Sequence, residues 1–210
     1  MLECVDVYNM PTTTEARILE LARLSGVIRP RDLVAQGLRP GAALQRLVRR
    51  GQLRRYGRGL YELPDAAFTE HHSLVEVAQR VPHGVVCLLS ALQFHRLGTQ
   101  WPHEIWIAID RKARRPQLES PRLRVSRFSG EALRADVETH VLEGVPVHIY
   151  GAAKTVADCF KYRHKIGLDV AIEALHDYIR KRSDTLDALW RAAQACRVAN
   201  VIRPYIEASL

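Results

Sequence analysis

Turn-forming residues divide the first 64 residues into short segments, and this division limits the folds open to them. Residues 12–26 carry apolar side chains at helical spacing after a run of threonines that can cap a helix. Residues 31–36 and 41–50 predict two further short helices, each ended by a glycine. Residues 52–56 and 60–63 are strand-like, and Gly-Arg-Gly between them is a hairpin signal. The order helix, helix, turn, helix, hairpin predicts a winged helix-turn-helix.

The basic residues of this region are concentrated in one stretch. Residues 33–61 hold seven arginines and no acidic residue. The whole chain has 31 Lys plus Arg against 23 Asp plus Glu, a formal net charge of +8. In a folded chain, acidic and basic residues are normally interspersed, which limits electrostatic repulsion. A stretch with basic residues only therefore favours a polyanionic partner such as DNA. On charge alone, a solvated basic face stays open as the alternative.

Helical spacing predicts which side of the third helix faces outward. Leu44, Leu47 and Val48 fall on one face, which we expect to pack on the first helix. The opposite face begins with a small residue, Ala42, which allows close entry into a major groove. Gln45 beside it suits adenine.

The arginines of this face and of the hairpin have distinct expected roles. Arg46 suits guanine, and the arginines further along the helix are expected at phosphates. The hairpin arginines are expected on the DNA backbone, with Arg58 at the tip probing a minor groove. The candidate DNA-binding residues are Arg39, Ala42, Gln45, Arg46, Arg49, Arg50, Arg54, Arg55 and Arg58.

The segment 44–61 has the pattern L-x-R-L-V-R-R-G-x-L-x-R-x-G-R-G-x-Y. This pattern resembles the N-terminal domain of AbiEi-type antitoxins, which are transcriptional regulators of type IV toxin–antitoxin operons. The likeness continues through the rest of the chain. It is carried there by Ser90-Ala91-Leu92, His95-Arg96-Leu97, Trp101-Pro102, the stretch 104–110 and Lys154-Thr155-Val156-Ala157-Asp158.

The resemblance implies a function in two parts. Such proteins bind inverted repeats of double-stranded DNA in their own promoter and repress the operon. They also antagonise a nucleotidyltransferase-like toxin, without a stable protein complex. We also expect the chain to be cytoplasmic, and a monomer or weak dimer that binds DNA cooperatively.

The rest of the chain predicts a larger domain, so that the chain as a whole is α+β. We expect a winged helix-turn-helix domain at 1–64, a linker at 65–71 and an α+β domain at 72–210. In the α+β domain, strands are predicted at 104–110, 123–128, 137–142 and 145–150, in a mostly antiparallel sheet. The helices expected to flank it are 73–80, 88–97, 152–163, 168–182, 185–196 and 199–208.

A second basic block follows the first of these strands. Residues 111–127 contain seven basic residues and one acid, Glu119, and two prolines favour an exposed, extended loop. One interpretation is a second nucleic-acid contact or a surface for an RNA-handling partner, and the other is a loop whose charges aid solubility. The candidate residues of this surface are Arg111, Lys112, Arg114, Arg115, Arg122 and Arg124.

Enzyme activity has weak support in the sequence. Asp110 and Lys112 give half of a D-x-K nuclease motif, but 77–103 contains no acid. Glu104 lies about 20 Å away along the same strand, too far to share a metal. No nucleophile elbow, phosphate-binding loop or metal-ligand spacing occurs. We therefore expect no enzyme, catalytic residue, metal or cofactor.

Two further features bear on compartment and core. The four cysteines are far apart and form no CxxC pair, which is typical of reduced, buried thiols in a cytoplasm. The longest apolar run, 84–92, is too short to cross a membrane, and no secretory signal is visible. Lys154 and Asp158, four residues apart on an expected helix, are interpreted first as an ordinary ion pair.

The leading hypothesis is a sequence-specific DNA-binding autorepressor that also acts as an antitoxin. The alternative is a protein-interaction module that caps a partner toxin directly, with DNA binding secondary.

Overall fold

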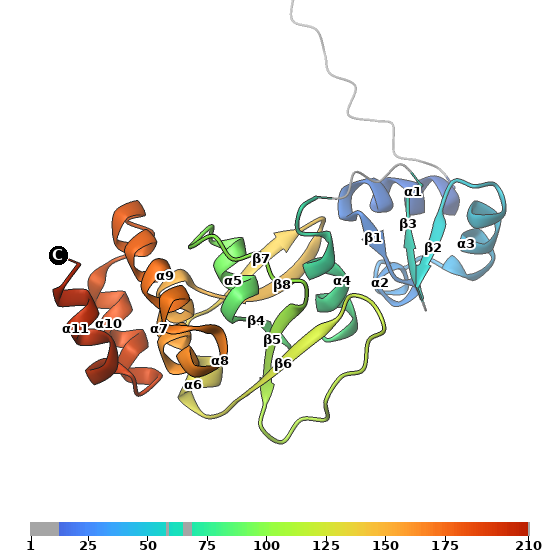
Figure 1. Cartoon of the computed structure of the whole chain (residues 1–210). Helices are drawn as coiled ribbons and strands as arrows, with labels where there is room; N and C mark the ends of the chain where they lie inside the picture. Colours follow the sequence, from blue (N-terminus) through green and yellow to red (C-terminus); the bar gives the residue numbers. More distant parts are fainter. Residues whose placement is uncertain (1–12, 58, 65–68, 210) are drawn as a thin grey trace, which may run out of the picture. The chain divides into compact units, whose positions relative to one another are not determined.

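A computed structural model of the chain describes residues 13–57, 59–64 and 69–209 (Figure 1). It divides into two compact units. The first is Met1–Thr69 with Glu143–Val145, and the second is Glu70–Leu142 with Pro146–Leu210. Among the described residues, no helix combines the length and the apolar character needed to cross a bilayer.

The first unit combines three helices with a small antiparallel sheet. The helices are α1 (Thr14–Ser25), α2 (Pro30–Ala35) and α3 (Pro40–Arg49). The strands are β1 (Val27–Ile28), β2 (Arg54–Gly57) and β3 (Leu60–Glu62), in the order β1-β3-β2. The three helices and the hairpin lie within a residue or two of their predicted positions. The sequence does not identify β1, because two apolar residues are too short to show an alternating pattern.

Local signals set the ends of these helices. Thr13 caps α1, and its side-chain oxygen accepts a hydrogen bond from the backbone N–H of Ala16 at 3.2 Å. Pro30 and Pro40 open α2 and α3, where their fixed φ favours the helix and no N–H is needed. Gly51 follows α3 with φ +69°, a backbone conformation that a glycine adopts without strain.

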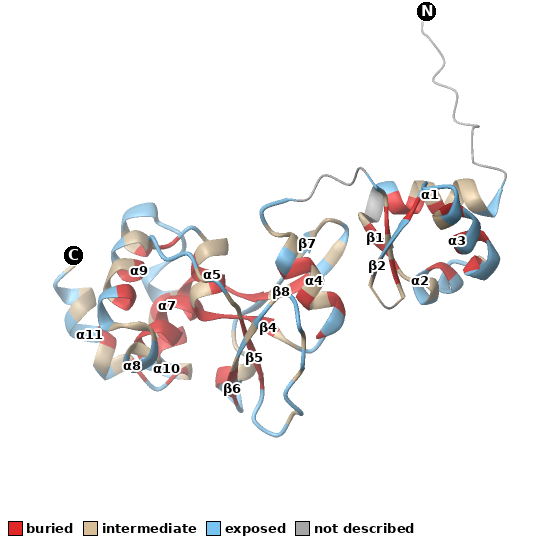
Figure 2. Ribbon diagram, turned by 45° about the vertical axis from the view of Figure 1, so that its right-hand side comes forward, coloured by how far each residue is buried: buried red, intermediate tan, exposed pale blue. Residues whose placement is uncertain are grey.

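The core of the first unit forms where α1, α2 and α3 meet. Ile18, Leu33, Leu44 and Leu47 are almost completely buried there and pack in one cluster. The predicted inward face of α3 is therefore the face that packs. Figure 2 shows buried stretches, in red, on the helices of this unit.

The second unit has a five-stranded sheet in the order β6-β5-β4-β8-β7. Its strands are β4 (Val85–Val86), β5 (Ile105–Asp110), β6 (Leu123–Phe128), β7 (Val137–Leu142) and β8 (Val145–Tyr150). The predicted mostly antiparallel sheet is wrong, because β5 pairs with β6 and β4 with β8 in parallel, while β4 and β5 are antiparallel. The long segment 111–122 carries the chain back to the start of β6, which a hairpin turn could not do.

Helices complete the second unit. They are α4 (His72–Arg80), α5 (Leu88–Phe94), α6 (Glu131–Arg134), α7 (Ala152–Lys161), α8 (Arg163–Ile166), α9 (Leu168–Lys181), α10 (Leu186–Ala195) and α11 (Ala199–Glu207). Helix α7 is central: residues 151–160 are all buried, and α5, α9, α10 and α11 contact it. Figure 2 shows α7 in the buried colour along most of its length.

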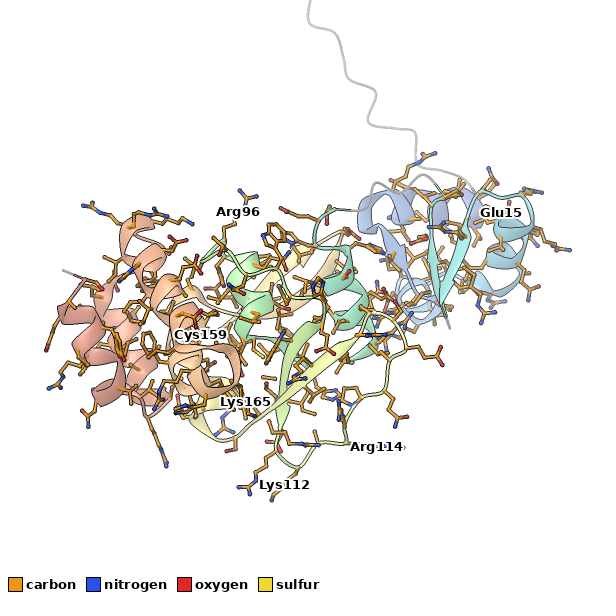
Figure 3. All side chains as sticks on the ribbon, in the orientation of Figure 1. Glu15, Arg96, Lys112, Arg114, Cys159 and Lys165 are labelled. Carbon is orange, nitrogen blue, oxygen red and sulfur yellow. The ribbon has the colours of Figure 1, made fainter. Side chains whose placement is uncertain are left out.

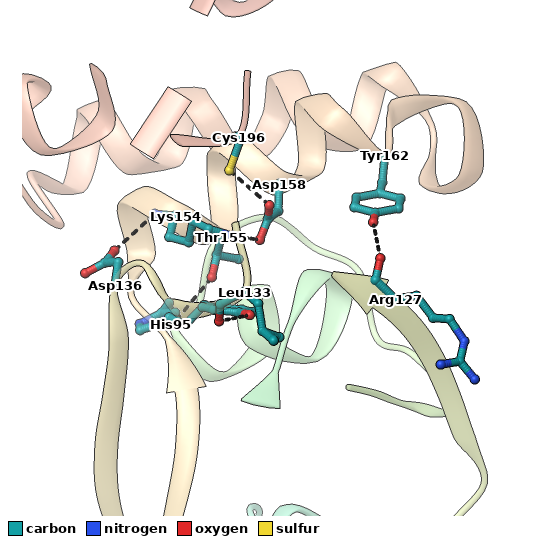
Figure 4. Close-up of polar contacts among 10 residues, drawn as sticks. His95, Arg127, Leu133, Asp136, Lys154, Thr155, Asp158, Tyr162 and Cys196 are labelled. Atoms are coloured by element: carbon teal, nitrogen blue, oxygen red, sulfur yellow. Dashed lines mark hydrogen bonds and ion pairs between the residues drawn. The ribbon is translucent and has the colours of Figure 1, made fainter. Parts of the chain in front are cut away.

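The core around α7 contains an ion pair. Lys154 and Asp158 are paired as the spacing predicts, and both side chains are completely buried. The Sγ of Cys196 donates to Asp158 Oδ1 at 3.1 Å (Figure 4). Cys87, Cys159 and Cys196 are free buried thiols, and burial raises the pKa of Cys87 and Cys159 well above the usual range. Cys4 lies outside the described residues.

Candidate nucleic-acid interface

Helix α3 presents a polar and basic face to solvent. Its buried positions recur at Ala43, Leu44 and Leu47, and this spacing turns the remaining face outward. The exposed residues of that face are Ala42, Gln45, Arg46, Arg49 and Arg50. The small residue therefore stands near the start of the helix, and the arginines follow toward its end.

An open groove lies between α3 and the sheet of the first unit. Its volume is about 410 Å³, and it is lined by Gln45, Val48, Arg49, Arg55 and Tyr61. Arg49 has no ion-pair partner among residues 13–57, 59–64 and 69–209, and Arg55 Nε donates only to the Gly57 carbonyl, at 3.4 Å. The groove brings two arginines, an amide and a phenol to one concave surface. Sequence reasoning missed Tyr61, because only the hairpin fold places it opposite α3.

An acidic residue from α1 reaches the arginines of α3. Glu15 Oε1 accepts from Arg46 Nε at 2.5 Å, and Glu15 Oε2 accepts from Arg50 Nη1 at 2.9 Å. The hydrogen bond from Arg46 holds the pKa of the Glu15 carboxyl below its usual value. The acid-free stretch 33–61 is therefore not free of acidic partners in the fold. Figure 3 labels Glu15 on the first unit.

Arg54 on the hairpin is also paired. It lies directly across β2–β3 from Glu62, and its Nη2 is 2.5 Å from Glu62 Oε1. The Glu62 side chain is fully buried, and its Oε2 has no hydrogen-bond partner among the described residues. Arg54 therefore neutralises a buried carboxylate, a structural role that the charge pattern alone did not indicate.

The nine predicted DNA-binding residues thus differ in their surroundings. Arg46, Arg50 and Arg54 are in ion pairs, yet their side chains remain 45 %, 61 % and 52 % exposed. Arg39, directly before α3, is also exposed. Arg58 lies outside the described residues. The remaining members, Ala42, Gln45, Arg49 and Arg55, are exposed.

The basic loop between β5 and β6 belongs to the second unit. Arg111, Lys112, Arg114, Arg115 and Arg122 are exposed, and none has a side-chain ion pair with a residue in the described ranges. Arg124, on β6, lies 3.8 Å from Glu104 and over the Trp106 ring. Figure 3 labels Lys112 and Arg114 on this loop.

Arg127 anchors the beginning of that loop. Its Nη1 donates to the backbone carbonyls of Asp110, Arg111 and Ala113 at 3.2, 2.8 and 2.8 Å. Its own carbonyl accepts from the Tyr162 hydroxyl at 3.3 Å (Figure 4). Arg127 therefore has a structural role. The positive charge available to a partner comes from the other basic residues of the loop.

The nuclease alternative gains no support from the geometry around Asp110. Its Oδ1 accepts from the backbone N–H of Lys112 at 2.8 Å, which caps the turn that follows β5. Within the part of the chain that the structure describes, no three His, Cys, Asp or Glu side chains gather closely enough to hold a metal ion.

Comparison with known proteins finds a family similarity in the first unit. Residues 16–64 match the model of a family described as transcriptional regulator, AbiEi antitoxin. That description names a regulator and no reaction. No protein in the curated set matches the chain.

A solved structure shares the fold over most of the chain. It is the crystal structure of the RV2827C protein from Mycobacterium tuberculosis, with a TM-score of 0.58 and 17% sequence identity. The match covers 94% of this chain and 78% of that one. At this identity the likeness concerns the fold alone.

Proposed function

Since residues 16–64 match the AbiEi family of antitoxins and transcriptional regulators, we propose that this chain is a sequence-specific DNA-binding autorepressor. In this proposal α2, the turn after it and α3 form the helix-turn-helix, and the β2–β3 hairpin is the wing. The observation that carries the proposal is the exposed face of α3, which includes Ala42, and on which Gln45 and Arg49 line an open groove.

The chemistry of that face fits duplex DNA. Ala42 permits the start of α3 to approach the floor of a major groove, and Gln45 then reaches base edges. Arg49 and Arg55 line the adjoining groove and suit phosphates. The paired arginines are exposed enough to contribute as well, since phosphate oxygens can replace or share a carboxylate partner.

The antitoxin half of the proposal rests on the family match. By that likeness the chain represses its own promoter through inverted repeats and opposes a nucleotidyltransferase-like toxin without a stable complex. Two half-sites require two copies of the chain, bound cooperatively. Direct capping of a toxin is the alternative, and it predicts that a toxin produced in the same cells co-purifies with the chain.

Salt dependence tests DNA binding. If about six phosphates are contacted, log K against log salt should have a slope near −5 on duplex DNA from the promoter region.

Arg49→Ala should weaken binding to every sequence and reduce the slope by about 0.9. Gln45→Ala should instead lose about 1–3 kcal/mol of preference for the promoter sequence. Arg191→Ala, an equal charge change at an exposed site on α10, is the matched control. A flat salt response would contradict the proposal.

The basic loop of the second unit is proposed as a second nucleic-acid contact. Its exposed, unpaired Arg111, Lys112, Arg114, Arg115 and Arg122 support this role. Replacing Arg111, Lys112 and Arg114 together by alanine should lower the salt slope further, by up to about 0.9 for each phosphate lost. If the triple variant keeps the wild-type slope and affinity, the loop is only a solvated surface.

A further inference from the structure

Glu15 brings a negative charge to the face of α3 that is proposed to contact DNA. One carboxylate holds two arginines a helical turn apart, Arg46 through Nε at 2.5 Å and Arg50 through Nη1 at 2.9 Å. The Glu15 side chain is 22 % exposed, and the two arginines are 45 % and 61 % exposed. The contact is therefore partly exposed and is accessible to a ligand.

Packing holds Glu15 in this position. Ile18 and Ala22 follow it by three and seven residues, so they lie on the same face of α1, and both are fully buried. They pack in one cluster with Leu44 and Leu47 of α3. Glu15 also lies in the first turn of α1, where the helix dipole favours a carboxylate.

The pairing leaves the far end of Arg46 available. A guanidinium has five N–H donors in a planar fork, and within the described residues Arg46 donates only through Nε. The two Nη groups can then form the bidentate contact with guanine O6 and N7 that arginine makes in major grooves. Because the Nε bond already restricts the side chain, less conformational freedom is lost when Arg46 meets the base.

The same carboxylate offsets part of the positive charge on α3. Non-specific binding to DNA depends on neutralising phosphates, so a carboxylate among the arginines weakens binding to every sequence. We propose that Glu15 is a positioning residue for sequence readout: it orients Arg46 toward a guanine and lowers affinity for non-specific DNA. This inference rests on the proposed DNA-binding function, and it assigns discrimination between sequences to a residue outside the recognition helix.

The test compares specific and non-specific binding. Wild-type protein first selects sequences from a pool of random duplexes, and dissociation constants are then measured on the enriched duplex and on a scrambled duplex of equal composition. In Glu15→Gln the scrambled duplex should bind more tightly, with a salt slope steeper by about 0.9. The ratio of specific to non-specific affinity should fall by roughly tenfold. Glu20→Gln makes the same charge change on α1, at a residue paired with Arg17, and should leave the ratio near the wild-type value.

Two further variants test whether Glu15 acts through Arg46. Glu15→Gln combined with Arg46→Ala should give the same ratio as Arg46→Ala alone. Arg46→Lys keeps a charge partner for Glu15 but lacks the planar fork, so the ratio should fall while the circular dichroism spectrum stays unchanged.

Opposite results overturn the inference in recognisable ways. A wild-type ratio in Glu15→Gln, or binding to both duplexes weakened by the same factor, refutes the assignment. If wild-type protein enriches no sequence from the random pool, the proposed DNA-binding function itself fails, and that outcome is seen before any variant is made.

Discussion

At the scale of single residues, Arg54 shows that an arginine on a basic hairpin can have two roles, a contact with DNA and a structural ion pair. Its side chain is 52 % exposed and so accessible to DNA, and it also pairs with the buried carboxylate of Glu62. Removing Arg54 leaves a charge without compensation inside the first unit. A loss of DNA binding in an Arg54 variant would therefore not by itself show a DNA contact.

Stability measurements distinguish these roles. Arg54→Ala should lower the free energy of unfolding of the first unit by about 1–3 kcal/mol, because a buried acceptor loses its partner. Adding Glu62→Leu to the same variant should restore most of that loss. Urea denaturation of the wild type, the single and the double variant measures both effects. Equal stability of all three proteins would show that the pair contributes nothing to the fold.

Glu15 gives a pH dependence with a defined sign. The hydrogen bond from Arg46 lowers its pKa in the folded protein. Its contribution to stability is therefore fully present above the ordinary glutamate pKa, about 4.3, and is lost as the pH falls through the lowered value. An NMR titration of the Glu15 carboxyl should show a midpoint below that of an ordinary glutamate, and Arg46→Ala should move it upward. An unchanged midpoint in Arg46→Ala would show that Arg46 is not the cause.

At the scale of elements, the stability of the buried helix α7 depends on an ion pair between two of its own side chains, Lys154 and Asp158. Asp158→Leu leaves Lys154 buried and unpaired, so we expect a loss of about 3–5 kcal/mol in the free energy of unfolding of the second unit. Lys154→Met together with Asp158→Leu removes both charges at similar volume and should be far closer to the wild type. Guanidinium denaturation followed by far-UV circular dichroism measures the difference. A double variant as unstable as Asp158→Leu would contradict this account.

The elements that the sequence predicts well are those set by local signals. The face of α3 follows from helical periodicity, and Glu143-Gly144 marks the turn between β7 and β8, whose bounds agree with the prediction. The parallel pairing of β5 with β6 depends on contacts between segments that are distant in the sequence. The alternation of apolar and polar residues along one strand does not indicate which strand it pairs with. Glu15 is 31 and 35 residues away from Arg46 and Arg50 in the sequence. The sequence alone therefore does not indicate that these arginines have an acidic partner.

At the scale of the whole molecule, each unit has a core of its own. Leu47 is fully buried in the cluster formed by α1, α2 and α3, and Leu175 is fully buried in the cluster around α7. Separate cores of this kind are expected to open in separate cooperative steps rather than in one. The α3 surface proposed to bind DNA then depends on the first core alone.

Hydrogen exchange tests that separation. Leu47→Ala should cost about 2–5 kcal/mol in the first unit and accelerate amide exchange through α1, α3 and the β2–β3 hairpin. Exchange in α7 and α9 should keep its wild-type rate. Leu175→Ala is the matched control, since the same substitution in the other core should produce the reverse pattern. If either variant accelerates exchange equally in both units, the chain opens as one cooperative body, and a weakened α7 core would then reduce DNA binding as strongly as a weakened α3.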